Sequence, residues 1–246
     1  MKDTIQHNIN IINERIEAAC LRSGRQRSEV QLLLATKTVP ADRIKLALEC
    51  GELLIAENKV QEIKEKYEVL KSTQHTKHFI GHLQSNKIKD ILKYDVACIQ
   101  SIDRFELAEK LNQRLLFEGK TMDVFVQANT SYEESKFGAR PEDLIPLIEQ
   151  IAGLEALRIK GLMTIGLFSA EAEKVRKCFR LLKGLQEQAK ALNIPQVQLD
   201  ELSMGMSNDL EIAIEEGATI IRVGTAIFGE RIYPDSYYWN EAKKIK

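Results

Sequence analysis

The stretch LLLATKTVP, residues 32–40, begins as an apolar run and ends on a lysine between two threonines, just ahead of Pro40. A short apolar run is typical of a buried strand, and a proline fits the first turn of a helix, so a strand followed directly by a helix is predicted. Lys37 then stands where the strand ends. A lysine there is either a solvated charge or an amine at the mouth of a pocket that can condense with an aldehyde.

Seven further apolar runs, rich in β-branched residues, repeat this pattern along the chain. With the first they are QLLLAT (31–36), ELLIAE (52–57), HFIG (78–81), DVACIQ (95–100), DVFVQA (123–128), IKGLMTI (159–165), VQLDELS (197–203) and ATIIRVG (218–224). Helical segments separate them, which predicts parallel strands covered by helices. Eight repeats favour a closed (β/α)8 TIM barrel over an open doubly wound sheet. No linker rich in glycine or proline divides residues 1–246, so we expect a single domain.

The helical segments carry recognisable start and stop signals. Apolar residues at helical spacing predict an extra helix ahead of the barrel, ending near Gly24: Ile5, Ile9, Ile12, Ile16 and Cys20. Pro40 and Gly51 bound the next helix, and Val60, Ile63, Tyr67 and Leu70 mark another. Asp103 and Glu106 fit a capping box ahead of Phe105. Pro146 should kink the helix that opens at Pro141 or shift its start.

The composition excludes several classes of protein. Hydrophobic residues make up 44% and charged residues 29% of the 246 positions, as in soluble globular proteins. The 35 basic and 36 acidic residues form no long block, which argues against nucleic-acid and membrane partners. Four scattered cysteines indicate idle thiols, and the start lacks a signal-peptide core. We expect a cytoplasmic protein with a small-molecule partner.

Two segments near the end of the chain point to a phosphate. SMGMSND (203–209) and GTAIFG (224–229) bring Ser207, Gly224 and Thr225 to the starts of helices that follow the seventh and eighth predicted strands. Small residues at such helix starts expose backbone N–H groups, and TIM barrels commonly bind phosphate in these two loops. The alternative is that Ser207 only caps its helix and Gly224 only turns the chain.

Other polar residues near the strand ends have open roles. Arg222 lies between apolar neighbours, so it either forms a salt bridge to a carboxylate on another strand or faces a ligand ring atom. Asn58 either contacts a ligand or caps the helix after it, and Met163 either packs on a ring or fills the core. His78 and His82 have no acidic or thiol partner, so we expect no metal site. A phosphate cradle opposite Lys37 fits pyridoxal 5′-phosphate (PLP), a phosphorylated aldehyde.

Seven motifs together resemble a known family over nearly the whole chain. They are LLLATKTVP (32–40), IAENKVQE (55–62), HFIGHLQSNK (78–87), IQSID (99–103), GLMTI (161–165), LSMGMSND (202–209) and IRVGTAIFGER (221–231). In this set the chain is similar to the pyridoxal 5′-phosphate homeostasis protein family, related in fold to the N-terminal barrel domain of alanine racemases.

The resemblance implies specific roles for the candidate residues. Lys37 would hold PLP as a Schiff base, and Arg222 would face the pyridine nitrogen. The phosphate would be held by Ser207, Gly224 and Thr225. Asn58 would lie near the cofactor, in a segment that reads AEN, with Ala56 where glycine is common.

The resemblance also implies a role in intracellular vitamin B6 balance without an established catalytic turnover. An arginine opposite the pyridine nitrogen stays charged and makes the ring a weaker electron sink. Two alternatives remain: a PLP-dependent amino-acid racemase of limited rate, and a barrel that binds another phosphorylated metabolite. The tail after Phe228 is shorter than the second domain of alanine racemases, so we expect a monomer whose Tyr233, Tyr237 and Tyr238 pack on the barrel rim.

Overall fold

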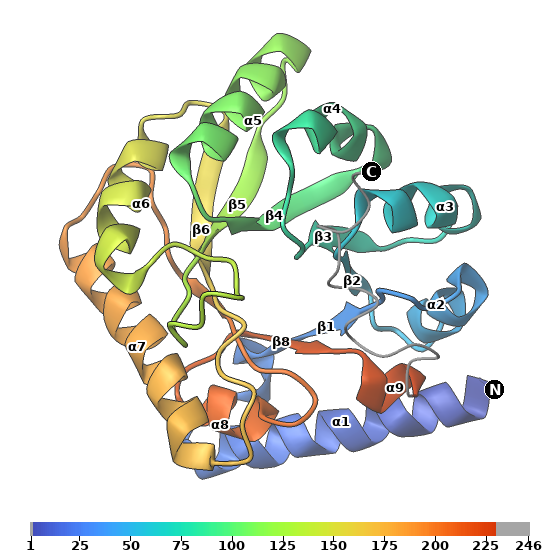
Figure 1. Cartoon of the computed structure of the whole chain (residues 1–246). Helices are drawn as coiled ribbons and strands as arrows, with labels where there is room; N and C mark the ends of the chain where they lie inside the picture. The colour runs from blue at the N-terminus through green and yellow to red at the C-terminus, as the bar shows by residue number, and fades with distance from the viewer. Residues whose placement is uncertain (1, 230–246) are drawn as a thin grey trace.

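A computed structural model describes residues 2–229 of the chain and forms a closed parallel barrel with strand order β1 to β8 (Figure 1). The strands are β1 (Gln31–Ala35), β2 (Leu54–Glu57), β3 (Thr76–Phe79), β4 (Val96–Ile102), β5 (Met122–Gln127), β6 (Leu157–Met163), β7 (Glu201–Ser203) and β8 (Ile220–Val223). β8 pairs with β1 and closes the barrel, with Leu33 opposite Arg222. The predicted TIM barrel is therefore confirmed.

Helices surround the barrel, and α1 lies across its lower edge in Figure 1 beside α8 and α9. The α-helices are α1 (Lys2–Arg22), α2 (Ala41–Leu48), α3 (Val60–Leu70), α4 (Ile88–Ile91), α5 (Phe105–Glu118), α6 (Leu144–Ala152), α7 (Ala172–Ala191), α8 (Leu210–Glu215) and α9 (Thr225–Phe228). Short 3-10 turns are η1 (Arg27–Glu29), η2 (Ser85–Lys87), η3 (Leu92–Tyr94) and η4 (Pro141–Asp143). The extra helix ahead of the barrel is confirmed as α1.

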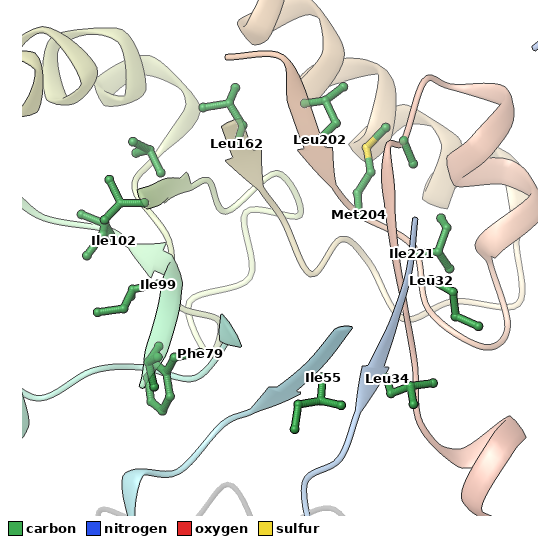
Figure 2. Packing of buried hydrophobic residues seen from close by; sticks show 14 of the residues in the cluster. Leu32, Leu34, Ile55, Phe79, Ile99, Ile102, Leu162, Leu202, Met204 and Ile221 are labelled. Carbon is green, nitrogen blue, oxygen red and sulfur yellow. The ribbon is translucent and has the colours of Figure 1, made fainter. Parts of the chain in front are cut away.

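The hydrophobic core has an outer and an inner part, because successive residues of a strand point to opposite faces. The outer core fills the space between strands and helices, and Figure 2 shows members such as Leu32 and Leu34. The inner core fills the barrel with one buried residue from most strands: Leu33, Ala56, Cys98, Phe125, Met163 and Ile220. Inward positions nearer the carboxyl ends of the strands are therefore free to carry polar groups.

Two predictions about helix starts needed the structure to settle them. Pro146 shifts the start of its helix: η4 covers Pro141–Asp143, and α6 begins at Leu144, so the proline falls in the first turn of α6. The capping box at Asp103 is wrong. α5 follows Arg104, which caps it without a side-chain bond, and Asp103 instead pairs with Arg104 at 2.5 Å.

Two negative findings hold for residues 2–229. No helix in this part of the chain combines the length and the apolar character that a membrane crossing requires. The same residues contain no cluster of histidine, cysteine and acidic side chains arranged to bind a metal ion. The predicted packing of Tyr233, Tyr237 and Tyr238 lies outside the described residues.

We expect Ile12→Ala to lower the free energy of unfolding by about 2–5 kcal/mol, because it empties a buried site of α1 in the outer core. The adjacent Ile11 is 41% exposed, so Ile11→Ala is a matched control that should stay within about 0.5 kcal/mol of the wild type. Urea unfolding followed by circular dichroism measures both values. Equal losses for the two variants would contradict the assigned packing of α1.

Candidate functional site

Lys37 lies two residues beyond β1, at the carboxyl end of the barrel. Its side chain is half-buried and makes contacts within the protein. The next residue, Thr38, has φ 66°, in the left-handed region. A β-branched residue rarely adopts this conformation, so the backbone beside Lys37 is strained and must be held by its surroundings.

A buried ionic cluster holds the strained segment. Lys66 of α3 donates to Glu57 at the end of β2 (2.8 Å), to Glu62 (2.8 Å) and to the carbonyl of Thr36 (2.9 Å). Glu57 also accepts a 2.7 Å bond from the Thr36 hydroxyl. Glu62 accepts the N–H of Thr38 at 2.6 Å. Both neighbours of Lys37 are thereby anchored to one ammonium group and its two carboxylates.

The two carboxylates of this cluster have opposite pKa shifts. Burial raises the pKa of Glu57 to about 7, against the attraction of Lys66. Burial also opposes ionisation of Glu62, but Lys66 and the N–H of Thr38 outweigh it and hold the pKa of Glu62 below its usual value. Within the described residues the second oxygen of Glu57 is buried and accepts no hydrogen bond. Lys66 is therefore the charge that favours the ionised form of Glu57, which burial opposes.

Asn58 follows β2 and does not cap α3. That helix begins at Val60, and its cap residue Lys59 makes no side-chain bond. The Oδ1 atom of Asn58 is buried without a hydrogen-bond partner among the described residues. A Cβ atom on Gly81 would lie 1.9 Å from the Asn58 carbonyl oxygen, so only glycine allows this approach. Ala56 sits inside β2 without a positive φ, so alanine is accommodated there.

The two predicted phosphate loops meet at the carboxyl end of the barrel. The hydroxyl oxygens of Ser207 and Thr225 lie 3.4 Å apart. Ser207 is half-buried and Thr225 is exposed. Ser207 does not cap α8, because Asp209 occupies that position. Gly224 caps α9, and a Cβ atom there would lie 2.8 Å from the Ala35 carbonyl oxygen of β1.

Helix α1 supports both loops from outside the barrel. Arg15 donates to the carbonyl oxygen of Ser207 at 3.0 Å and forms a salt bridge with Glu211 at 2.7 Å. Asn8 donates to the carbonyl oxygen of Ile227 in α9 at 3.0 Å. The loops therefore have external supports that do not involve their hydroxyl groups.

Arg222 is 5% exposed in β8, and no carboxylate of residues 2–229 lies within salt-bridge distance of it. The guanidinium instead donates to the hydroxyl of Ser203 (2.9 Å) and the carbonyl of Thr164 (2.8 Å). Burial lowers its pKa to about 10, with Asp209 opposing the change, so the group stays charged at neutral pH. The predicted salt-bridge alternative is not found among the described residues.

Beyond Arg222, Ser203 takes part in a row of hydrogen bonds that crosses the barrel. Its hydroxyl donates to Oε1 of Gln100 in β4 at 2.6 Å. The amide nitrogen Nε2 of Gln100 lies 2.8 Å from Nδ1 of His78 in β3. Burial lowers the pKa of His78 to about 4, so its imidazole is neutral at physiological pH.

Met163 and His82 are the remaining residues that the sequence singled out. Met163 is 1% exposed in the inner core, where it packs as core. His82 stacks on Phe137, with ring centroids 3.9 Å apart, and its Nδ1 lies 3.4 Å from Asp103. A cavity of about 320 Å³ beside α3 is lined partly by Asn58 and His82.

The structure thus brings Lys37, Asn58, Arg222 and the Ser207–Thr225 pair to one end of the barrel. It adds contributors that the sequence prediction missed: Glu57, Glu62 and Lys66 around Lys37, and Gln100 and Ser203 beneath Arg222. The letters AEN and IQS of two motifs contain two of these residues, Glu57 and Gln100. Their inward direction and partners become visible only when the strands are closed into a barrel.

The sequence and the fold of this chain are similar to those of known proteins. Residues 2–232 match the family model for the alanine racemase N-terminal domain. A pyridoxal phosphate homeostasis protein of Aquifex aeolicus is 44% identical over 220 residues, covering 89% of this chain and 95% of the relative. The solved structure of PipY from Synechococcus elongatus with PLP bound superposes with a TM-score of 0.76 at 34% identity, covering 89% and 100% of the two chains.

An alanine racemase of Clostridium difficile shows the same fold at a greater distance. Its TM-score is 0.76 at 15% identity, covering 95% of this chain and 58% of that chain. At this identity the likeness concerns the fold alone and assigns no racemase activity.

We expect Lys66→Met to lower the free energy of unfolding by about 3–5 kcal/mol near neutral pH, because it leaves the buried carboxylate of Glu57 without its cation. A raised carboxyl pKa means that the folded chain binds its proton more tightly than the unfolded chain. Stability from Glu57 is therefore lost as the pH rises from the ordinary value of 4.5 through about 7. The loss in Lys66→Met should accordingly shrink towards acidic pH.

Lys64→Met on the exposed side of α3 is the matched control and should change stability by less than about 0.5 kcal/mol at either pH. Urea unfolding across the acidic to neutral range measures both variants. A loss in Lys66→Met that grows on acidification would contradict the proposed pairing.

Proposed function

This chain belongs to the family of pyridoxal phosphate homeostasis proteins, which carry the alanine racemase N-terminal domain, and we propose that it binds PLP as a Schiff base on Lys37 and serves vitamin B6 homeostasis. The observation that carries this proposal is the convergence at one end of the barrel. An amine, a charged guanidinium without a carboxylate partner in residues 2–229 and a pair of hydroxyl groups come from β1, β8 and the loop after β7.

The residues fit the chemical groups of PLP. Ser207, Gly224 and Thr225 offer hydroxyl and backbone donors for a phosphate. Asn58 keeps a buried side-chain oxygen without a partner in the described residues, as expected where a ligand group completes the site. Met163 fills part of the apolar inner core of the barrel.

Arg222 favours storage of the cofactor over catalysis. Bound PLP supplies an aldehyde for an amine and a ring that withdraws electrons. A guanidinium that stays charged opposite the ring nitrogen disfavours a proton on that nitrogen and weakens the withdrawal. The proposal therefore takes residues 1–246 as one PLP-binding barrel domain that acts as a carrier. That the protein is a monomer in the cytoplasm stays a prediction, which light scattering and cell fractionation can test.

We expect the purified protein mixed with PLP to absorb in the visible range, and borohydride to fix the cofactor to Lys37. Lys37→Ala should lose both properties because no other amine ends β1. Lys59→Ala, with its lysine after β2, is the matched control and should keep them. Absorption spectra and peptide mass mapping after reduction measure the outcome. The same labelled peptide in wild type and Lys37→Ala would refute the attachment site.

We expect the double variant Ser207→Ala, Thr225→Val to bind PLP roughly tenfold or more weakly, because hydrogen bonds to a charged group each contribute about 1.5–3 kcal/mol. Its affinity for pyridoxal, which lacks the phosphate, should stay near that of the wild type. Titration followed by absorption gives both dissociation constants. A parallel loss for both compounds would show that these hydroxyl groups do not recognise the phosphate.

A further inference from the structure

A row of polar side chains crosses the interior of the barrel just above the inner core. Arg222 of β8, Ser203 of β7, Gln100 of β4 and His78 of β3 follow one another through hydrogen bonds of 2.9, 2.6 and 2.8 Å. Ser203 and Gln100 are fully buried. Four strands therefore contribute to one continuous row of polar side chains above the apolar inner core.

The direction of each hydrogen bond in this row follows from its charged end, Arg222. A guanidinium can only donate, so the Ser203 oxygen accepts from Arg222. The Ser203 hydroxyl proton is then available to Gln100, and a separation of 2.6 Å suits O–H···O better than N–H···O. The atom of Gln100 facing Ser203 is therefore its carbonyl oxygen.

The same logic determines the state of His78. With its oxygen turned to Ser203, Gln100 presents its NH2 group to Nδ1 of His78 at 2.8 Å. Nδ1 must accept this bond, so the proton of a neutral imidazole lies on Nε2. The lowered pKa of His78 agrees with an imidazole that stays neutral at physiological pH.

We propose that Ser203, Gln100 and His78 are positioning residues, which hold the guanidinium of Arg222 in one orientation at the floor of the cofactor site. This inference rests on the proposed function only in taking Arg222 to face the PLP ring. No carboxylate of residues 2–229 pairs with Arg222. Apart from Ser203, its guanidinium is bound only by the backbone carbonyl of Thr164 among these residues. The hydrogen-bonded row of Ser203, Gln100 and His78 holds the guanidinium at a second point, which prevents this planar group from rotating.

The first test uses the protein without cofactor. In protein labelled with 15N-histidine and 15N-arginine, NMR should show His78 with its proton on Nε2 and an unprotonated Nδ1 at neutral pH. The side-chain N–H resonances of Arg222 should be sharp, as for a guanidinium that does not rotate. A proton on Nδ1, or an imidazolium, would overturn the proposal, whether or not the protein binds PLP.

Two variants of Gln100 separate positioning from packing. Gln100→Leu keeps most of the volume but removes both hydrogen bonds, so the Arg222 resonances should broaden and PLP should bind about two- to tenfold more weakly, with a shifted absorption maximum. Gln100→Glu keeps an oxygen for Ser203 and places a second oxygen against His78. It should restore the Arg222 resonances and the absorption maximum while His78 gains a proton on Nδ1.

The outcomes distinguish this inference from the proposed function. If wild type binds no PLP, the proposed function fails and the NMR results still decide the inference. If PLP binds to Lys37 and Gln100→Leu leaves both the Arg222 resonances and the absorption maximum unchanged, the positioning role is refuted and the proposed function stands. Circular dichroism confirms that each variant is folded before it is compared.

Discussion

The ammonium group of Lys66, held between Glu57 and Glu62, is the interaction on which the site at Lys37 depends. Isolated, each of these buried charges would be costly, and together they satisfy one another and the backbone of residues 36 and 38. The left-handed conformation of Thr38 persists because this cluster over-determines it. Lys37 thus stands on a segment whose conformation is set from a neighbouring strand and helix.

The two sides of the site balance their buried charges in different ways. Around Lys37 charges pair with charges, whereas beneath Arg222 a lone charge is balanced by neutral dipoles among the described residues. A carboxylate within salt-bridge distance of Arg222 would neutralise the charge of the guanidinium. Serine, glutamine and a neutral histidine orient the guanidinium, and no carboxylate of residues 2–229 lies within salt-bridge distance of it. The polarity of the barrel floor therefore agrees with a protein that binds a cofactor without exploiting it for carbanion chemistry.

The fold could be predicted from the sequence because its signals are local and repeated. The isoleucine stripe of α1 and the apolar runs of the strands each report burial over a few residues. The capping box at Asp103 failed because the adjacent Arg104, whose guanidinium also donates to the carbonyl of Leu83 after β3, pairs with the carboxylate. For the candidate site, strand-end position predicted Lys37, Ser207 and Arg222, which the structure places at one end of the barrel. It could not reveal the pairing of Gln100 with Ser203, which are 103 residues apart and meet only across a closed barrel.

The support that α1 gives to the loops after β7 and β8 also orders the assembly of the molecule. Arg15 and Asn8 belong to the first segment made, yet their partners at Ser207 and Ile227 are among the last of the described residues to leave the ribosome. Closure of β1 on β8 joins the same two ends. Contacts of such long sequence separation form late in folding, because a long loop must first be closed. The contacts that close the barrel and those that support the loops after β7 and β8 therefore join the same two ends of the chain, and a ligand that binds these loops only in the folded protein would stabilise the whole barrel against unfolding.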